Sequence, residues 1–565
     1  MASPKFPEPP PSMPPSSKDD VDQLLERLAN NKHRWAKLGV PERIAHLKSV
    51  IDGTLKASAR WVEAVCRAKG IHADSHQAGE AWLSDPMPVV RNARLLIEAL
   101  EQGGQPKPPS LKRRDDGQWV ASVFPGNTID KLMFAGFTGE VWIEPGKEPS
   151  QGRIYREKLT EGKLSLVLGA GNIGSIGPMD ALYKLFVENE LVVLKMNPVN
   201  EYIGPFIAEA FQRLVDEGYL GVVYGGAEIG EYLTHHDAVE TIHITGSDRT
   251  HDAIIWGGSP DEQAKNKAAS TPVLSKPITS ELGCVTPVFV VPGPWSTKEL
   301  EFQARHVASM VAHNASFNCN AAKAVLTASG WELREKFLNK LHEELAAIPS
   351  RKAYYPGAQG RYDAFLEKYP RAKALGERST EVVPWTVIPE VAPTADEYAL
   401  SNEAFCGVLA DVTVEARDAA EFMQEAARIA NDEIWGTLSC MVLVHPETEK
   451  RHAKAFDRFI ADLRYGGIAI NAWAGVIYGL VTTTWGAFPG HPLDDIRSGR
   501  GVVHNTYLFD HPQKSVLRAP FVIKPTPAWF ATHKNLKALG EKLTHFEGGP
   551  SFLKLPGVVG AALKG

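Results

Sequence analysis

The side chain best suited to covalent chemistry in this chain is a cysteine between two amides. The chain has five cysteines at wide spacings, Cys66, Cys284, Cys319, Cys406 and Cys440. No CxxC pair occurs, so we expect free thiols in a reducing compartment and neither a zinc ribbon nor a redox dithiol. Cys319 is flanked by Asn318 and Asn320 instead of a hydrophobic run. A thiolate there could attack carbon and later leave, provided that its pKa falls from the usual value.

A glycine-rich turn offers a second kind of chemistry. Gly169-Ala-Gly171-Asn-Ile-Gly174 matches GxGxxG and lies between a buried-type strand and a helical run. A full dinucleotide fingerprint requires an acid at the end of the next strand, where this chain has Lys195-Met-Asn-Pro198. The motif alone therefore leaves two alternatives, a dinucleotide site and a tight turn that needs small residues.

Two other classes of catalytic site lack their patterns. The 18 histidines include a group at 235, 236, 243 and 251, but neither HExxH nor a paired Cys/His spacing accompanies them. We therefore expect no metal site. No GxSxG turn occurs either, which argues against a serine hydrolase of that type.

The elements that must position these side chains form two alternating regions. Buried-type strands at 164–170, 191–197, 220–226 and 240–246 alternate with helical runs, which predicts a parallel sheet covered by helices. Ligands bind such sheets at the carboxyl ends of the strands. A second α/β region runs from about 285 to 480. Residues 21–70 read as helices, 105–118 as a loop, and 140–144 with 152–157 as a β-hairpin.

Several separated segments carry a resemblance that no single motif does. VVLKMNP, GGAEIGEYL, ITGS, SELGC, HNASFNC and NEAFCGVL follow one another along the chain. In that order they resemble the aldehyde dehydrogenase superfamily, whose corresponding motifs read VVLKPSE, G-x-x-x-G, FTGS, ELGG, N-x-G-Q-x-C and EIFGPV. The resemblance covers roughly residues 25–505.

This resemblance implies a fold class and a division of the chain. The expected class is α/β, with a parallel-sheet dinucleotide-binding domain, an α/β catalytic domain and a bridging β-hairpin that pairs subunits. The expected segments are a disordered Pro-rich arm at 1–20, the NAD(P)-binding domain at 21–134 and 161–283, the catalytic domain at 284–490, bridging segments at 135–160 and 491–520, and a C-terminal extension at 521–565.

The resemblance also implies catalytic roles for three residues. Cys319 would attack the aldehyde to give a thiohemiacetal, which hydride loss converts into a thioester. Glu281 would activate the water that hydrolyses this thioester, as a carboxylate can when burial raises its pKa. The Asn172 amide and the Cys319 backbone N–H would stabilise the oxyanion.

The cofactor implied is NAD or NADP. Lys195 would hold a ribose hydroxyl or a phosphate, Ser247 would lie near the pyrophosphate at a helix start, and Glu403 with Phe405 would bind the nicotinamide ribose. The complete expected cofactor set is Lys195, Gly226, Gly230, Gly246, Ser247, Leu282, Glu403 and Phe405.

Departures from the family pattern leave alternatives open. Pro198 replaces the acid that favours NAD, so NADP becomes acceptable. Ser316 and Phe317 replace Gly-Gln before the nucleophile, and Cys284 replaces the second glycine of ELGG. A CoA-dependent acylating enzyme and a non-catalytic binding or scaffold protein therefore remain alternatives, although retention of Glu281 favours hydrolysis.

Composition limits partners and location. The net charge of -6 and the pI of about 6.3 argue against nucleic acid or an anionic membrane as the main partner. No apolar run reaches membrane-spanning length, and the N-terminus lacks a secretory signal, so we expect a cytoplasmic protein. The expected partners are a small aldehyde and further copies in a homodimer or homotetramer. An apolar tunnel could include Trp385, Trp435, Trp473 and Trp485.

Overall fold

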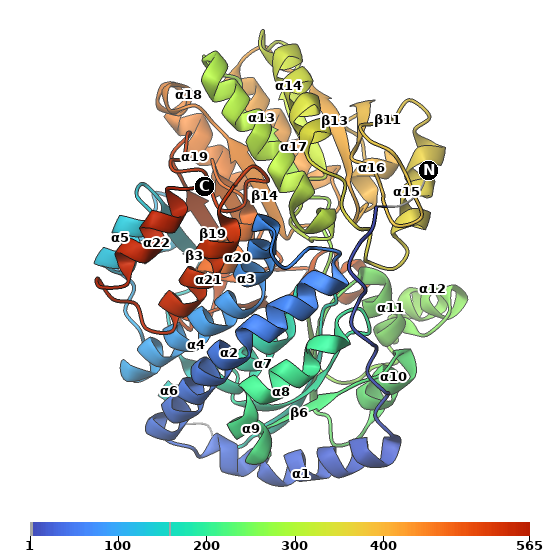
Figure 1. Ribbon diagram of the computed structural model, residues 1–565, viewed down its shortest axis with the longest axis vertical. Coiled ribbons are helices and arrows are strands. Elements are labelled where there is room, and N and C mark those ends of the chain that lie inside the picture. Colours follow the sequence, from blue (N-terminus) through green and yellow to red (C-terminus); the bar gives the residue numbers. More distant parts are fainter. Residues whose placement is uncertain (1–3, 158–159) are drawn as a thin grey trace.

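The computed structural model describes residues 4–157 and 160–565 (Figure 1). Residues 1–3 of the expected arm and 158–159 of the expected bridging segment lie outside the described residues. In the part described, strands form sheets of eleven, six and two strands, with a large apolar core around each of the first two. The expected α/β class with parallel sheets is confirmed.

The six-stranded sheet is parallel except at one edge. Its order is β17 (Gly499–Arg500), β8 (Ile278–Glu281), β7 (Thr241–Thr245), β4 (Lys163–Leu168), β5 (Glu190–Lys195) and β6 (Leu220–Val223). Every residue of β5 is buried, as expected for a strand covered on both faces. Strands β4, β5 and β6 follow one another outward, whereas β7 returns to the other side of β4. The strand order therefore reverses between β4 and β7, and ligands bind beyond such a point.

Helices cover this sheet. They are α1 (Lys18–Ala36), α2 (Val40–Ala68), α3 (Gly79–Ser84), α4 (Pro86–Glu101), α7 (Ile176–Phe186), α8 (Gly204–Ala210), α9 (Gln212–Asp216), α10 (Ala227–His235), α11 (Asp248–Trp256) and α12 (Pro260–Ala269). Short 3-10 turns are η1 (His76–Ala78) and η2 (Glu201–Ile203). Helix α7 packs on β4 and β5, and α2 runs beside α4 and α8 (Figure 1).

The eleven-stranded sheet holds the second α/β region. Its order is β1 (Ser110–Arg113), β2 (Trp119–Phe124), β3 (Thr138–Ile143), β19 (Pro512–Arg518), β15 (Gly467–Ile470), β14 (Ser439–Leu443), β9 (Pro287–Val290), β10 (Ala324–Ala328), β13 (Val408–Val414), β12 (Thr386–Val391) and β11 (Lys373–Ala374). Strands from β19 to β12 are parallel, and β1, β2 and β3 join as an antiparallel extension.

The remaining elements belong to neither of the two large sheets. They are α5 (Thr128–Met133), α13 (Thr297–Ala312), η3 (His313–Ser316), α14 (Arg334–Ala347), α15 (Ala358–Lys368), α16 (Tyr398–Ser401), α17 (Ala419–Asp432), α18 (Pro446–Arg451), α19 (Ala453–Asp462), α20 (Ala474–Leu480), β16 (Trp485–Gly486), η4 (Leu493–Asp495), β18 (Val502–Val503), α21 (Leu536–Glu547) and α22 (Leu555–Ala562).

The expected hairpin is wrong in its second half. Strand β3 covers the first half, but it pairs with β2 and β19. Residues 152–157 contain helix α6 (Arg153–Arg156) instead of a strand. Gly152 adopts a left-handed φ of 59°, and the Arg156 guanidinium donates to the Asp510 carboxylate at 3.1 Å, so the chain turns here. The expected loop at 105–118 likewise contains β1, which pairs with β2.

Both terminal segments lie against the body. Residues 4–17 form no helix or strand, yet the Met13 backbone N–H donates to Glu201 at 3.0 Å and the Ser16 N–H to the Tyr224 carbonyl at 3.1 Å. In the described residues, the arm that we expected to be disordered therefore follows the surface. At the other end, α21 packs on α3 and α4 (Figure 1). None of the helices described is long and apolar enough to cross a membrane.

Candidate active site

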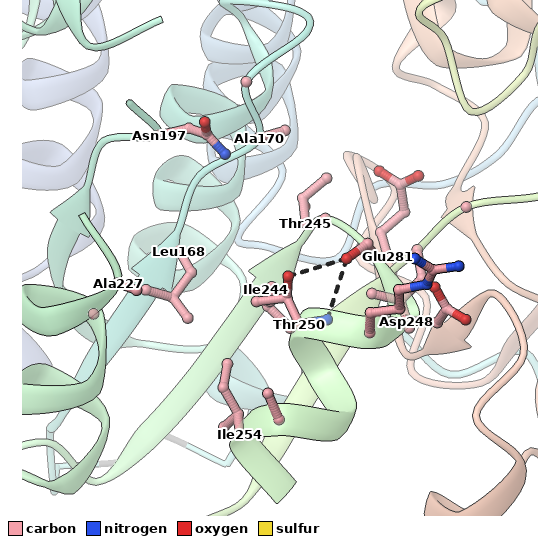
Figure 2. Close-up of a pocket in the computed structure, with 18 of the residues that line it drawn as sticks. Leu168, Ala170, Asn197, Ala227, Ile244, Thr245, Asp248, Thr250, Ile254 and Glu281 are labelled. Atoms are coloured by element: carbon pink, nitrogen blue, oxygen red, sulfur yellow. Dashed lines mark hydrogen bonds between the residues drawn. The ribbon is translucent and has the colours of Figure 1, made fainter. Parts of the chain in front are cut away.

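A cavity of about 1020 Å³ opens at the carboxyl ends of the six-stranded sheet, where the strand order reverses. Its wall includes the residues that follow β4 and those that follow β7 (Figure 2). All of the predicted site residues line it, namely Asn172, Lys195, Gly226, Gly230, Gly246, Ser247, Glu281, Leu282, Cys319, Glu403 and Phe405. The topology therefore gathers segments that are more than 200 residues apart in sequence into one chamber.

Two helices begin at the cavity wall. A Cβ atom added to Gly226 or Gly230, at the start of α10, would meet no atom within 4 Å, so side chains there would enter the cavity. At the start of α11, the Ser247 hydroxyl accepts the Thr250 backbone N–H at 3.1 Å (Figure 2). First-turn N–H groups of helices attract anions.

Apolar side chains line another part of the wall. Leu168, Ile244 and Ile254 gather beside Ala227 (Figure 2). Lys195, at the end of β5, also lines the cavity, and burial lowers its pKa. The cavity can thus receive both a flat apolar group and an anionic one.

Glu403 lies deep in the wall without a complete set of partners. Its Oε1 atom is buried and has no hydrogen-bond partner among the described residues. Burial raises the pKa of Glu403 to about 8. Its neighbour Phe405 adopts a positive φ of 41° and packs its ring against Tyr355 at 5.0 Å between centroids. Glu403 could hydrogen-bond a ligand hydroxyl.

A second, smaller cavity of about 190 Å³ meets the first. Both are lined by Asn172, Ile176, Glu281 and Cys319. Cys319 thus stands where the two cavities join, with a carboxyl and an amide in the same shared wall. A group bound in one cavity and a group bound in the other would both reach its thiol.

A strained loop positions Cys319. Asn314, Ala315 and Ser316 all have positive φ values, of 52°, 55° and 69°. Such angles cost free energy in non-glycine residues and persist only where surrounding contacts hold them. The Asn314 amide donates to the Phe317 carbonyl at 3.1 Å and to the Asn172 carbonyl at 3.3 Å.

The loop is also held from its far side. The buried Lys323 ammonium donates to the Ser316 carbonyl at 2.9 Å and to its hydroxyl at 2.8 Å. Tyr354 donates to the Asn172 carbonyl and to the Asn314 amide oxygen, both at 3.1 Å. We did not predict Lys323, Tyr354 or Asn314 as site residues. Asn314 heads the HNASFNC segment, and a lysine inside the apolar run AAKAVL is a further signal that could have been used.

The electrostatics of the thiol differ from our expectation. The pKa of Cys319 is raised, first by removal from bulk solvent and then by the charges of Glu281 and Glu403. The expectation that the pKa of the Cys319 thiol falls is therefore wrong for this state of the site. Burial, reinforced by the charge of Asp180, raises the pKa of Glu281 to about 8. The thiol and the carboxyl thus lie side by side, and a base of this pKa suits proton transfer near neutral pH.

Two N–H donors remain for a developing oxyanion. Asn172 donates one amide proton to the Phe317 carbonyl at 3.0 Å, and its side-chain amide carries a second. The Cys319 backbone N–H has no acceptor among the residues described. Among those same residues, no group of His, Cys, Asp and Glu side chains could hold a metal ion.

A sequence model described as the aldehyde dehydrogenase family matches residues 179–359. A curated relative, N-succinylglutamate 5-semialdehyde dehydrogenase of Novosphingobium aromaticivorans, is 26% identical over 275 residues, or 47% of this chain. The match spans 54% of that relative, about half of its length. Residues 179–359 of the chain thus resemble the aldehyde dehydrogenase family in sequence.

Solved structures agree with the superfamily fold. The chain is similar to NAD-dependent aldehyde dehydrogenase from Sinorhizobium meliloti, with a TM-score of 0.61, 18% identity and coverage of 91% of this chain and 89% of that one. It is also similar to NADP-dependent glyceraldehyde-3-phosphate dehydrogenase from Bacillus halodurans C-125 complexed with NADP, with a TM-score of 0.60 and 16% identity. That match covers 89% of this chain and 92% of the other. The chain therefore shares the fold of these two structures over almost its whole length.

Residues at which the chain departs from the superfamily pattern lie in different places. Cys284 is fully buried against Gly436 and lines neither of the two cavities. Phe317, in place of glutamine, packs on Tyr354 at 5.0 Å between ring centroids. Of the tryptophans expected in an apolar tunnel, Trp473 and Trp485 line the smaller cavity. Trp435 lines the larger one, and Trp385 lines neither.

Proposed function

We propose that this chain oxidises an aldehyde to a carboxylic acid with NAD or NADP, through covalent catalysis by Cys319. The observation that carries this proposal is the position of Cys319 at the junction of two cavities, with Glu281 and Asn172 in the shared wall. Such a junction suits a reaction in which the group attached to sulfur gives up a hydride to a molecule on the other side.

The larger cavity fits a dinucleotide. The space beside Gly226 and Gly230, at the start of α10, would receive the pyrophosphate, because N–H groups at helix starts attract anions. The unpartnered Glu403 oxygen would accept a hydrogen bond from a ribose hydroxyl. Lys195 would bind the ribose or a 2′-phosphate, and the apolar side chains of Leu168 and Ile254 would receive the adenine ring. When bound, the oxidised nicotinamide would supply the hydride acceptor and a positive charge near the thiol.

The proposed chemistry begins at the thiol. Glu281, in its carboxylate form, takes the Cys319 proton, and the thiolate attacks the aldehyde carbon. The free proton of the Asn172 amide and the Cys319 N–H donate to the oxyanion of the thiohemiacetal. Loss of hydride leaves a thioester on Cys319.

Glu281 releases the Cys319 proton to solvent and then serves a second time. Its carboxylate accepts a proton from water as the water attacks the thioester, which releases the acid and restores the thiol. A carboxyl with a pKa of about 8 accepts that proton at mildly alkaline pH and returns it to the leaving thiolate. This use of Glu281 supports hydrolysis over transfer of the acyl group to CoA.

The test is formation of reduced nicotinamide, followed by absorbance, from NAD or NADP and a panel of aldehydes with and without CoA. Activity without CoA that disappears in Cys319→Ala supports the proposal. Activity only with CoA would replace it by the acylating alternative. Absence of both turnover and dinucleotide binding would favour the non-catalytic alternative.

Assembly and location remain predictions within this proposal. We infer a homodimer or homotetramer in the cytoplasm that acts on a small aldehyde. Light scattering on the purified chain measures the oligomeric state, and a fluorescent fusion in the source cell measures the location.

A further inference from the structure

The smaller cavity is built partly from a segment beyond the region that the family model matches. The C-terminal extension, residues 521–565, contributes Ala528, Trp529, Leu543 and Glu547 to its wall. Phe134 and Trp473 line it from other parts of the chain. Since the cavity reaches Cys319 at one end, the extension borders the space in which the group bound to sulfur must lie.

A buried ion pair fixes the extension in this position. Glu547, at the end of α21, accepts from the Arg91 guanidinium at 2.7 Å, and each of the two side chains is 4% exposed. Arg94 pairs with the same carboxylate and also donates to the Glu547 carbonyl at 3.0 Å. Burial would raise the pKa of Glu547, but the two guanidinium groups lower it, so the carboxylate stays charged. The extension is therefore anchored to α4.

The loop before α21 is fixed as well. The Ala531 backbone N–H donates to the Ser309 hydroxyl at 3.1 Å, and Phe530 packs on Phe302 at 5.1 Å between ring centroids. Trp529 lies between this anchored loop and the cavity, with its ring 5.7 Å from that of His306. Its indole is thus held as a wall and not as a mobile flap.

Size and polarity restrict what this cavity can hold. An apolar cavity of about 150 Å³ in another protein holds a benzene ring, and this one measures about 190 Å³. Three buried N–H groups of lining residues lack an acceptor among the described residues, those of Arg91 Nη2, Trp485 Nε1 and Trp529 Nε1. Buried donors without partners are costly, so a ligand oxygen that accepts from one of them binds more tightly.

We propose that the C-terminal extension completes the aldehyde cavity and limits the substrate to one substituted aromatic ring, with an acceptor oxygen on the ring facing Trp529. This inference rests on the proposed function. It assigns Trp529 and Leu543 as specificity-determining residues, although both lie more than 200 positions from Cys319 in sequence.

The test compares kcat/KM of the full chain for acetaldehyde, benzaldehyde, para-methoxybenzaldehyde and biphenyl carbaldehyde. We expect benzaldehyde to exceed both acetaldehyde and the two-ring aldehyde by about tenfold or more. The methoxy compound should exceed benzaldehyde by about fivefold, the effect of one neutral hydrogen bond. Equal values across the panel would overturn the size limit.

Variants of Trp529 separate the effect of its ring from the effect of its N–H group. Trp529→Ala should raise kcat/KM for biphenyl carbaldehyde by about tenfold and lower that for benzaldehyde. Trp529→Phe keeps an aromatic wall but lacks the N–H, so it should lose the methoxy preference alone. The matched control is Phe552→Ala, which removes an aromatic ring that is 60% exposed on the same extension and should leave every ratio unchanged. Ratios in the Trp529 variants that equal those of the parent would overturn the proposal.

Binding to Cys319→Ala distinguishes failure of this proposal from failure of the proposed function. Calorimetry with benzaldehyde and biphenyl carbaldehyde needs no turnover and no cofactor. If no aldehyde is oxidised but the ring-size preference persists in binding and relaxes in the double variant with Trp529→Ala, only the proposed function fails. If acetaldehyde is oxidised but neither ring compound is preferred, only the cavity assignment fails.

Discussion

At the residue scale, the feature with the clearest functional consequence is the pKa of Glu281. Burial and then the Asp180 charge raise it to about 8, so the carboxylate becomes the major form only above that pH. Proton acceptance from Cys319 or from water requires this form. We therefore expect kcat to increase with pH and to level off above about 8, as measured in initial-rate profiles with saturating aldehyde.

Two variants check that Glu281 is the titrating group. Glu281→Gln cannot accept a proton, so kcat should fall by about a hundredfold or more and lose this increase. Asp180→Asn removes a negative charge that raises the Glu281 pKa, so the increase should move to lower pH. A profile that is identical in the parent and in Glu281→Gln would show that another group sets the pH dependence.

The sequence predicted which residues meet at the site better than it predicted their chemical state. Asn172 follows β4 and Glu281 ends β8 of the six-stranded sheet, whereas Cys319 precedes β10 of the other sheet. The order of the motifs was enough to bring them together. The raised pKa of Cys319 depends instead on the removal of its thiol from bulk solvent and then on the charges of Glu281 and Glu403 beside it. Burial results from packing between distant segments, which spacing along the chain does not reveal.

At the scale of elements, helix α10 carries a prediction about cofactor binding. A side chain at Gly230 would enter the larger cavity, because a Cβ atom there would meet no atom within 4 Å. We expect Gly230→Val to weaken NAD or NADP binding by about tenfold or more, since the added methyl groups overfill the cavity. Fluorescence titration of the purified protein measures this affinity.

A second helical glycine provides the matched control. Gly360, in α15, also has no atom within 4 Å of an added Cβ, but it lies outside both cavities. Gly360→Val should therefore leave dinucleotide affinity unchanged. Equal affinity in the two variants would place the cofactor away from α10.

Elements with apolar runs were easier to predict than those held by single contacts. Strands β4 and β5 are buried parallel strands, and their continuous apolar sequences show this directly. Residues 152–157 look like a strand in sequence, yet they turn into α6 because Gly152 and the Arg156 contact with Asp510 redirect the chain. The partner residue lies more than 350 positions away, beyond the reach of any local pattern.

At the scale of the whole molecule, the site combines residues from both large sheets. Glu281 ends β8 of the six-stranded sheet, whereas Cys319 precedes β10 of the eleven-stranded one. Glu80, in α3, joins these halves, because its carboxylate binds Arg351 at 3.0 and 3.1 Å and accepts the Asn314 backbone N–H at 3.3 Å. One carboxylate, on a side chain that is 13% exposed, thus ties the N-terminal helices to the loop that carries Cys319.

This contact predicts how stability depends on pH. Burial alone would raise the pKa of Glu80, but Arg351, the His313 charge and the Asn314 N–H together more than offset it, and the result is a pKa of about 2 against an ordinary 4.5. Because the folded-state pKa is lower, the stabilisation is complete above about pH 4.5 and is lost as the pH falls towards 2. The shift corresponds to about 3 kcal/mol in the free energy of unfolding.

Glu80→Gln should remove that stabilisation at neutral pH, leaving Arg351 buried without its counter-charge. Urea unfolding of the parent and the variant should therefore differ by about 3 kcal/mol at neutral pH and converge in acid. Glu101→Gln, at an exposed carboxyl on α4, controls for the loss of one charge and should follow the parent. A difference between the parent and Glu80→Gln that persists unchanged in acid would mean that ionisation of Glu80 is not its source. Because Glu80 also accepts from Asn314, a loss of kcat in the folded variant would show that the same contact positions Cys319.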